Sequence, residues 1–219
     1  MIESILNHKR TFIIIAAFAG ILGCLIDLGA TYFLGNRIDG YNQFKGTMSQ
    51  MGISSSPVAK EVAICWIAMG ILIIIFGLGI RFAYEDKKET MIIISWLLIL
   101  YGFGEGLVSG IFPADKAGES HTWIGIVHNM IGGVGVTAIM IFPLYILKVI
   151  PDFKWISIII FSIGLIGIIL FGIGRLVTAP DNFLSVYKGS WQRLYVINYY
   201  VYIIIIALNM LFRVNYKNS

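Results

Sequence analysis

Residues 90–112, TMIIISWLLILYGFGEGLVSGIF, decide the fold class of this chain because they are long and apolar enough to cross a membrane. A helix needs about 20 mainly apolar residues to span the hydrocarbon core of a bilayer. Glu105 is the one charged residue in this stretch, and Gly102, Gly106 and Gly110 recur at a four-residue spacing. Small residues at that spacing let transmembrane helices approach closely. The stretch therefore predicts a tightly packed transmembrane helix.

Five further stretches meet the same requirement, and polar or turn-rich breaks of alternating length separate them. The chain is 58% hydrophobic and only 13% charged, which is far from the composition of a soluble globular domain. We predict an all-α polytopic membrane protein in which residues 1–219 form a single six-helix transmembrane domain. The predicted spans are 11–34, 59–83, 90–112, 123–149, 155–175 and 191–213, and the breaks include 85–89 and 151–154.

The distribution of lysine and arginine predicts the orientation of the bundle. Nine basic residues, Lys217 among them, fall on the face that carries both termini. The other face has seven, or five if Arg175 and Arg193 are intramembrane. Because basic residues favour the cytoplasmic side, we expect an N-in and C-in protein of a prokaryotic cytoplasmic membrane. The net charge of +4 reflects residues that flank spans, so no nucleic-acid partner is expected, and the oligomeric state stays open.

Charged side chains inside the predicted spans give the best functional signal. Asp27, Glu105, Arg175 and Arg193 fall at a similar depth near one membrane face. Intramembrane charges are costly, usually pair, and often mark functional sites. Two acids and two bases at one level predict a neutralised polar layer below a pocket, which Asn198 could extend. The arginines either clamp an anionic head group, which suits the guanidinium fork, or neutralise the two acids.

The densest polar stretch is GIFPAD at residues 110–115, followed by His121 and His128. Seven residues bring a helix back to nearly the same face, at a rise of about 10 Å, so both imidazoles could line one cavity. His121, His128 and either Asp115 or Glu105 could then supply three ligands of a catalytic zinc. Ser49 could assist as a hydrogen-bond donor. The alternative is that His121 anchors a helix end, while His128 makes a buried hydrogen bond or relays protons.

Three short motifs occur in order along the chain: SQMG at residues 49–52, GxFPxD at 110–115 with a following histidine, and GSWQRL at 189–194. Together they resemble the domain of unknown function 998 family (DUF998) of bacterial and archaeal integral membrane proteins. The resemblance implies a six-helix protein without an established activity, and it implies nothing about a metal. It also suggests that six positions matter more than their neighbours, namely Ser49, Phe112, Pro113, Asp115, His128 and Arg193.

These observations favour chemistry or binding on a membrane lipid, or on another small amphiphilic molecule that enters from the bilayer. The sharpest hypothesis is a metal-assisted hydrolase with His121, His128, Asp115 and Glu105 as ligands or acid–base groups, in which a metal would lower the pKa of bound water. The alternatives are a non-enzymatic binder, sensor or small carrier, and a subunit that binds another protein. The substrate-binding residues would be Ser49, Arg175, Arg193, Asn198 and Asp27.

Overall fold

A computed structural model describes residues 2–84, 87–116, 120–177, 179 and 181–216. Within these ranges all regular secondary structure is helical, which confirms the predicted all-α class. Glu85 and Asp86 of the second predicted break, and Lys217 of the orientation count, lie outside the described residues.

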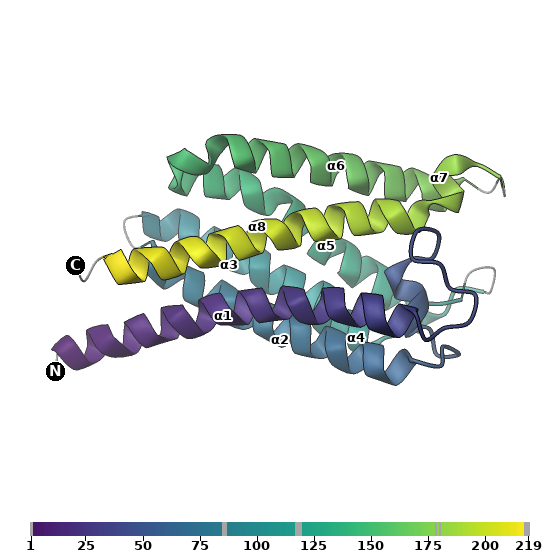
Figure 1. Cartoon of the computed structure of the whole chain (residues 1–219), viewed down its shortest axis with the longest axis horizontal. Coiled ribbons are helices and arrows are strands. Elements are labelled where there is room, and N and C mark those ends of the chain that lie inside the picture. Colours follow the sequence, from purple (N-terminus) through teal and green to yellow (C-terminus); the bar gives the residue numbers. More distant parts are fainter. Residues whose placement is uncertain (1, 85–86, 117–119, 178, 180, 217–219) are drawn as a thin grey trace.

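Six helical segments are long and apolar enough to cross a membrane, as the sequence predicts (Figure 1). Their bounds differ from the predicted spans by three residues or fewer, except that the first helix begins nine residues earlier (11 − 2). The third segment is composite, with a π-helical stretch inside it. The helices are α1 (Ile2–Gly35), α2 (Ala59–Ala83), α3 (Lys88–Tyr101) with η3 (Gly102–Val108) and α4 (Ser109–Ile111), α5 (Trp123–Val149), α6 (Lys154–Leu176) and α8 (Lys188–Tyr216).

Both termini lie at one end of the bundle, and the longer connections lie at the other (Figure 1). These connections carry two short helices, η1 (Met48–Gly52) and α7 (Phe183–Val186), whereas η4 (Pro151–Phe153) forms the short link between α5 and α6. We call the first end the terminal end and the second the loop end. Which end faces the cytoplasm stays a prediction.

The glycines of the third segment bring helices into backbone contact, as their spacing predicts. A Cβ atom added at Gly106 would overlap the backbone of Gly70 in α2, and one added at Gly102 would lie 2.7 Å from the Gly70 carbonyl oxygen. A Cβ atom at Gly110 would lie 2.8 Å from the carbonyl oxygen of Ala63. Close approach of α2 to the third segment therefore depends on these glycines.

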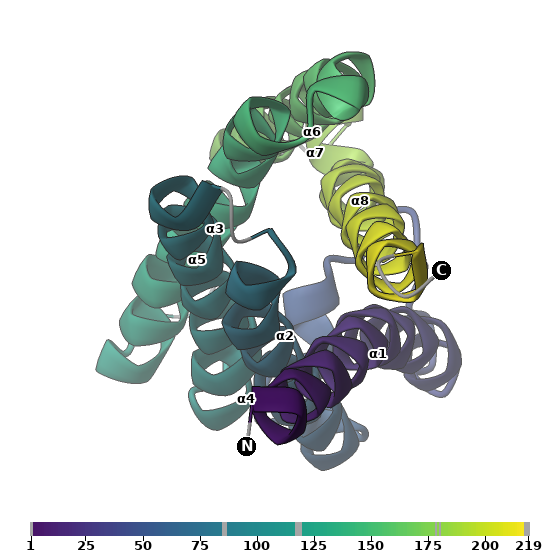
Figure 2. The same cartoon turned by 90° about the vertical axis from the view of Figure 1, so that its left-hand side faces the viewer.

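Helices α5 and α6 meet at η4 and diverge from there toward the loop end, as both views of the bundle show (Figures 1 and 2). Helix α8 lies beside α6 and α1. The polar residues described below lie in the loop-end half, where α5 and α6 are apart.

Candidate functional site

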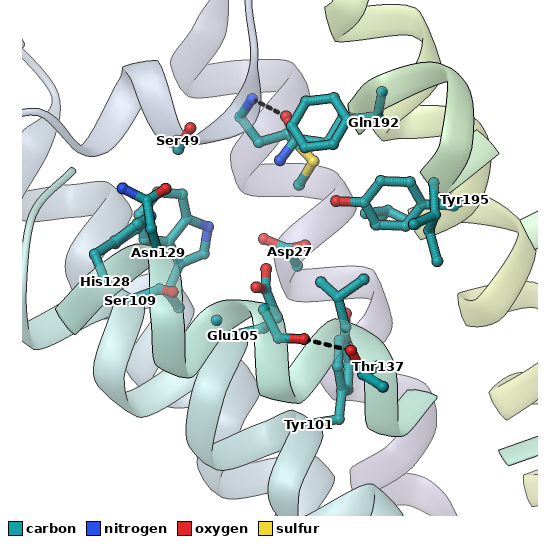
Figure 3. A pocket seen from close by; sticks show the side chains of 18 of the residues that line it. Asp27, Ser49, Tyr101, Glu105, Ser109, His128, Asn129, Thr137, Gln192 and Tyr195 are labelled. Carbon is teal, nitrogen blue, oxygen red and sulfur yellow. Dashed lines mark hydrogen bonds between the residues drawn. The ribbon is translucent and has the colours of Figure 1, made fainter. Parts of the chain in front are cut away.

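A cavity of about 250 Å³ lies in the loop-end half of the bundle (Figure 3). Its walls come from α1, α2, the third segment, α5, α6 and α8, together with η1. Five of the residues predicted from the sequence line it. They are Asp27, Ser49, Glu105, His128 and Arg175.

The π-helical stretch η3 places Glu105 in the cavity wall. In this stretch the backbone N–H of Ser109 donates to the carbonyl oxygen of Gly104, five residues earlier. Such π-turns often occur at functional sites because they widen the helix locally. A Cβ atom at Gly132 of α5 would lie only 2.8 Å from Oε1 of Glu105, so the absence of a side chain there makes room for the carboxyl group. No feature of the sequence pattern predicted the π-turn.

Asp27 lies at the base of the cavity and is only 2% exposed. Its Oδ2 accepts a hydrogen bond of 2.7 Å from the hydroxyl of Tyr200, which in turn accepts one of 3.0 Å from the hydroxyl of Tyr101. Its Oδ1 has no hydrogen-bond partner. The indole of Trp66 lies near this carboxyl group but does not meet Oδ1 in hydrogen-bond geometry. One buried oxygen of Asp27 is therefore unsatisfied by the protein.

His128 joins α5 to the turn that ends the third segment. Its Nδ1 lies 2.8 Å from the carbonyl oxygen of Phe112. Because a carbonyl oxygen only accepts, this contact assigns the proton to Nδ1, and Nε2 of the neutral ring is then an acceptor. The side chain is buried and lines the cavity. The buried hydrogen bond is the alternative role that the sequence left open for His128.

A second hollow of about 160 Å³ adjoins the cavity on the loop side. Both hollows are lined by Ser49, Asn129, Phe171 and Arg175, so they share a wall and we call the outer one the vestibule. The vestibule is lined in addition by Asp115, Lys116, His121 and Lys188.

Asp115 binds the N-terminal end of α5. Its Oδ2 accepts from the backbone N–H of Thr122 at 3.0 Å, and its Oδ1 accepts from the Thr122 hydroxyl at 2.6 Å. These hydrogen bonds lower the pKa of Asp115 below its ordinary value. A Cβ atom at Gly125 would overlap the carboxyl group, so this glycine permits the contact. The exposed His121 lies outside, with Nδ1 3.8 Å from Oδ2 of Asp115.

The predicted zinc site of His121, His128 and Asp115 is not formed. Among the residues that the structure describes, no three histidine, cysteine, aspartate or glutamate side chains gather closely enough to hold a metal ion. His128 uses Nδ1 for the carbonyl of Phe112, and Asp115 uses both oxygens for Thr122. The seven-residue spacing therefore puts the two histidines into different structural contacts.

Arg193 differs most from its predicted place. Its guanidinium group donates to the carbonyl oxygens of Gly46 at 2.7 Å and Gly189 at 3.2 Å, to the Tyr41 hydroxyl at 2.7 Å, and to Oε1 of Gln43 at 2.6 Å. It is not among the residues that line the cavity. Arg193 therefore fastens the first loop onto the start of α8 instead of facing a ligand.

The predicted neutral layer, with Asn198 as its extension, is not formed among the described residues. Nδ2 of Asn198 donates to the carbonyl oxygen of Ile160 at 2.7 Å, so this residue ties α8 to α6 and does not line the cavity. Within the described ranges neither Arg175 nor Arg193 forms an ion pair with Asp27 or Glu105. Neither intramembrane acid therefore has a basic partner in direct contact, although the charge of Arg193 acts on Asp27 over a longer distance.

Arg175 lies in the wall that the cavity and the vestibule share. One of its terminal nitrogens donates to Oδ1 of Asn129 at 3.1 Å, and its guanidinium carbon lies 5.8 Å from the centre of the Phe171 ring. A guanidinium group has five N–H donors, so most of those of Arg175 are available to a ligand. The predicted role of Arg175 in holding an anionic group stays open.

Exposed residues in the cavity wall indicate that the cavity opens to the side of the bundle between α5 and α6. Three cavity-lining residues of α5, Asn129, Gly133 and Thr137, are exposed, and so is Arg175 of α6. Large exposed apolar side chains flank this opening, which we call the lateral opening. They include Met130 and Val134 on α5 and Ile169 and Ile173 on α6. In a membrane this surface would face lipid chains.

The fold and the cavity together define a class: a multi-pass membrane protein with six membrane-length helices and a polar cavity among them. The model of the family described as "Protein of unknown function (DUF998)" matches residues 21–209, and the chain belongs to this family. The three sequence motifs predicted this membership correctly. No curated protein and no solved structure matches the chain. An activity must therefore be argued from the site itself.

Proposed function

We propose that this protein binds a small amphiphilic molecule of the membrane, whose polar head enters the cavity through the lateral opening while its apolar part stays among lipid chains. The observation that supports the proposal most is a polar cavity within the membrane-length helices, lined by Asp27 and Glu105, whose carboxyl groups keep oxygens without hydrogen-bond partners among the described residues. A buried acceptor without a partner is costly, so it favours a bound group that satisfies it.

The site favours binding over hydrolysis. Asp115 and His128, two of the proposed catalytic residues, already hold the turn between the third segment and α5. His121 lies exposed in the vestibule, away from Glu105 in the cavity wall. Asp115 and His121 therefore lie in the vestibule, apart from Glu105 and His128 in the cavity wall, so the four proposed acid–base residues do not share one hollow. We place the protein in a prokaryotic cytoplasmic membrane with both termini inside, on the basis of its basic residues.

The test compares two leucine substitutions at glycines whose added Cβ atom meets open space. Gly133 lines the cavity, whereas Gly172 lies on α6 outside it, and nothing lies within 4 Å of either added Cβ atom. Native mass spectrometry of protein purified in mild detergent measures the bound amphiphile. We expect the wild type and Gly172→Leu to retain it and Gly133→Leu to lose it. A wild type without bound amphiphile, or equal retention by all three proteins, would contradict the proposal.

A further inference from the structure

The cavity has an excess of hydrogen-bond acceptors. Besides Oδ1 of Asp27, the carboxyl group of Glu105 has no hydrogen bond or ion pair with the described residues. Nε2 of the neutral His128 ring is a third acceptor, because Nδ1 is bound to a carbonyl. In Figure 3 the Asp27 and Glu105 side chains point toward one another across the cavity, with His128 to one side.

Five of the hydroxyl and amide groups that line the cavity already donate within the protein. The hydroxyls of Tyr101 and Tyr200 form the chain that ends at Asp27. The hydroxyl of Ser109 donates to the carbonyl of Gly104, and Thr137 donates to that of Gly133. The Asn129 amide donates to the carbonyl of Gly125. The part of a ligand that lies against Asp27 and Glu105 should therefore bring donors, and beside two carboxyl groups it should bring a positive charge.

The apolar part of the wall suits a cation as well. Aromatic rings of Trp66, Tyr101, Tyr195 and Phe171 line the cavity. Aromatic faces attract ammonium groups, and the attraction is strongest where water is excluded. A protonated amine has three donors, which the open acceptor atoms of Asp27, Glu105 and His128 can accept. Carboxylates and rings around one space are thus complementary to a single amine.

The outer rim of the cavity has the opposite charge. Glu105 lies six residues before Ile111, the last residue of its segment (111 − 105), which corresponds to a depth of about 9 Å. Arg175 lies one residue before the end of α6, near the membrane surface, and keeps donors unused. Guanidinium groups suit phosphate and carboxylate oxygens. Lys188 adds a second positive charge in the vestibule.

We propose that the cavity selects a zwitterionic head group, with a protonated amine between Glu105 and Asp27 and an anionic group, such as a phosphate, at Arg175. The inference rests on the proposed function and specifies the ligand of the same site. The same chemistry occurs in the head group of an aminophospholipid and in a soluble amino phosphate. The lateral opening between α5 and α6 favours the lipid.

The experiment uses the full chain in nanodiscs or mild detergent and measures binding of defined probes by native mass spectrometry. Phosphatidylethanolamine and phosphatidylglycerol with identical chains differ in the amine, and glycerophosphoethanolamine carries the head group without chains. We expect the wild type to bind phosphatidylethanolamine at least about tenfold more tightly than phosphatidylglycerol. Glycerophosphoethanolamine should bind more weakly than the lipid. Stronger binding of the soluble head group would assign the site to a soluble zwitterion.

Glu105→Gln is the decisive variant because it removes the charge with little change in shape and breaks no hydrogen bond within the described residues. It should lose the preference for the amine. Glu61→Gln is its matched control, since Glu61 of α2 forms an exposed ion pair with Arg37 outside the cavity. Arg175→Gln should weaken binding of both phospholipids, because both carry the phosphate. Thermal stability in detergent verifies that each variant is folded.

The outcomes separate the two proposals. If the wild type binds neither phospholipid and carries no other amphiphile, both the proposed function and this inference fail. If it binds both phospholipids equally, amphiphile binding stands and the amine selection fails. The inference is also overturned if Glu105→Gln keeps the preference for phosphatidylethanolamine, because the amine would then bind elsewhere.

Discussion

At the terminal end of the bundle, buried polar side chains bond to one another across helices. Tyr202 of α8 and Ser157 of α6 share a hydrogen bond of 2.5 Å, and the Tyr84 hydroxyl donates to Oδ1 of Asn209 at 2.6 Å. Arg81 of α2 donates to Ser95 Oγ of α3 at 2.6 Å. Nε of Arg213 is unpaired there, and its guanidinium carbon lies 4.6 Å from the centre of the Tyr84 ring.

At the loop end, the buried polar groups are divided between structure and an open cavity. Arg193, His128 and Asp115 hold loops and helix ends together, whereas Asp27 and Glu105 keep carboxylate oxygens without protein partners. Polar groups that close contacts between helices add stability, and polar groups left unpaired lower it. The difference indicates that the loop-end cavity is retained for something other than stability, which is why we assign function to that half.

The largest effect should come from the glycine contact that carries Glu105. Gly106→Ala would place a Cβ atom onto the backbone of Gly70, and the backbone cannot move aside as a flexible side chain can. Overpacking of this kind costs about 1–3 kcal/mol or more, so we expect a clear drop in thermal stability and in amphiphile binding. Gly172→Ala is the matched control, because its added Cβ atom meets open space outside the cavity. Thermal unfolding in detergent measures the stability of both variants, and native mass spectrometry measures their bound amphiphile. Equal unfolding midpoints would refute the packing argument.

A pair of substitutions compares the two ends directly. Tyr202→Phe removes a hydroxyl and leaves Ser157 Oγ buried without its partner, which should lower stability by about 1–3 kcal/mol. Glu105→Gln removes a charge that has no protein partner, so stability should stay the same or rise slightly. The same unfolding measurement covers both variants. A larger loss for Glu105→Gln than for Tyr202→Phe would mean that Glu105 serves the fold, and the distinction between the ends would be lost.

The sequence predicted the six spans because length and apolar composition set them almost locally. It also predicted the close packing of Gly102 and Gly106, which follows from spacing on one helix. It did not predict the π-turn at Glu105. In hindsight the signal is a glycine at every second position, 102, 104 and 106. The backbone of α2 approaches Gly102 and Gly106, and the backbone of α5 approaches Gly104.

Arg193 explains why the site was only partly predictable. Its partner Gln43 lies 150 residues away in the chain, so no local pattern could reveal that the first loop returns to the start of α8. Counting hydrophobic residues placed Arg193 at the same depth as Arg175, although only Arg175 lines the cavity. The sequence therefore located the polar end of the bundle. The division of its residues between structural and open roles required the fold.

The smallest effect concerns Asp115, a structural residue of the loop end. Hydrogen bonds from Thr122 lower its pKa below the ordinary aspartate value. A depressed pKa in the folded state means that the carboxylate stabilises the fold above the pKa of the unfolded chain, and that this contribution is lost as the pH falls through the folded-state pKa. Asp115→Asn should therefore be less stable than the wild type at neutral pH.

The difference between Asp115→Asn and the wild type should shrink as the pH is lowered from about 7 to about 3, because the wild-type carboxylate becomes protonated. Thermal midpoints of both proteins in detergent across that range measure the effect. Thr122→Ser is the matched control, since serine keeps the hydroxyl donor, and it should follow the wild-type pH profile. A constant difference at every pH would show that Asp115 acts through shape alone. Packing alone would then stabilise the start of α5 at the loop end, and the contrast with the hydrogen-bonded terminal end would become sharper.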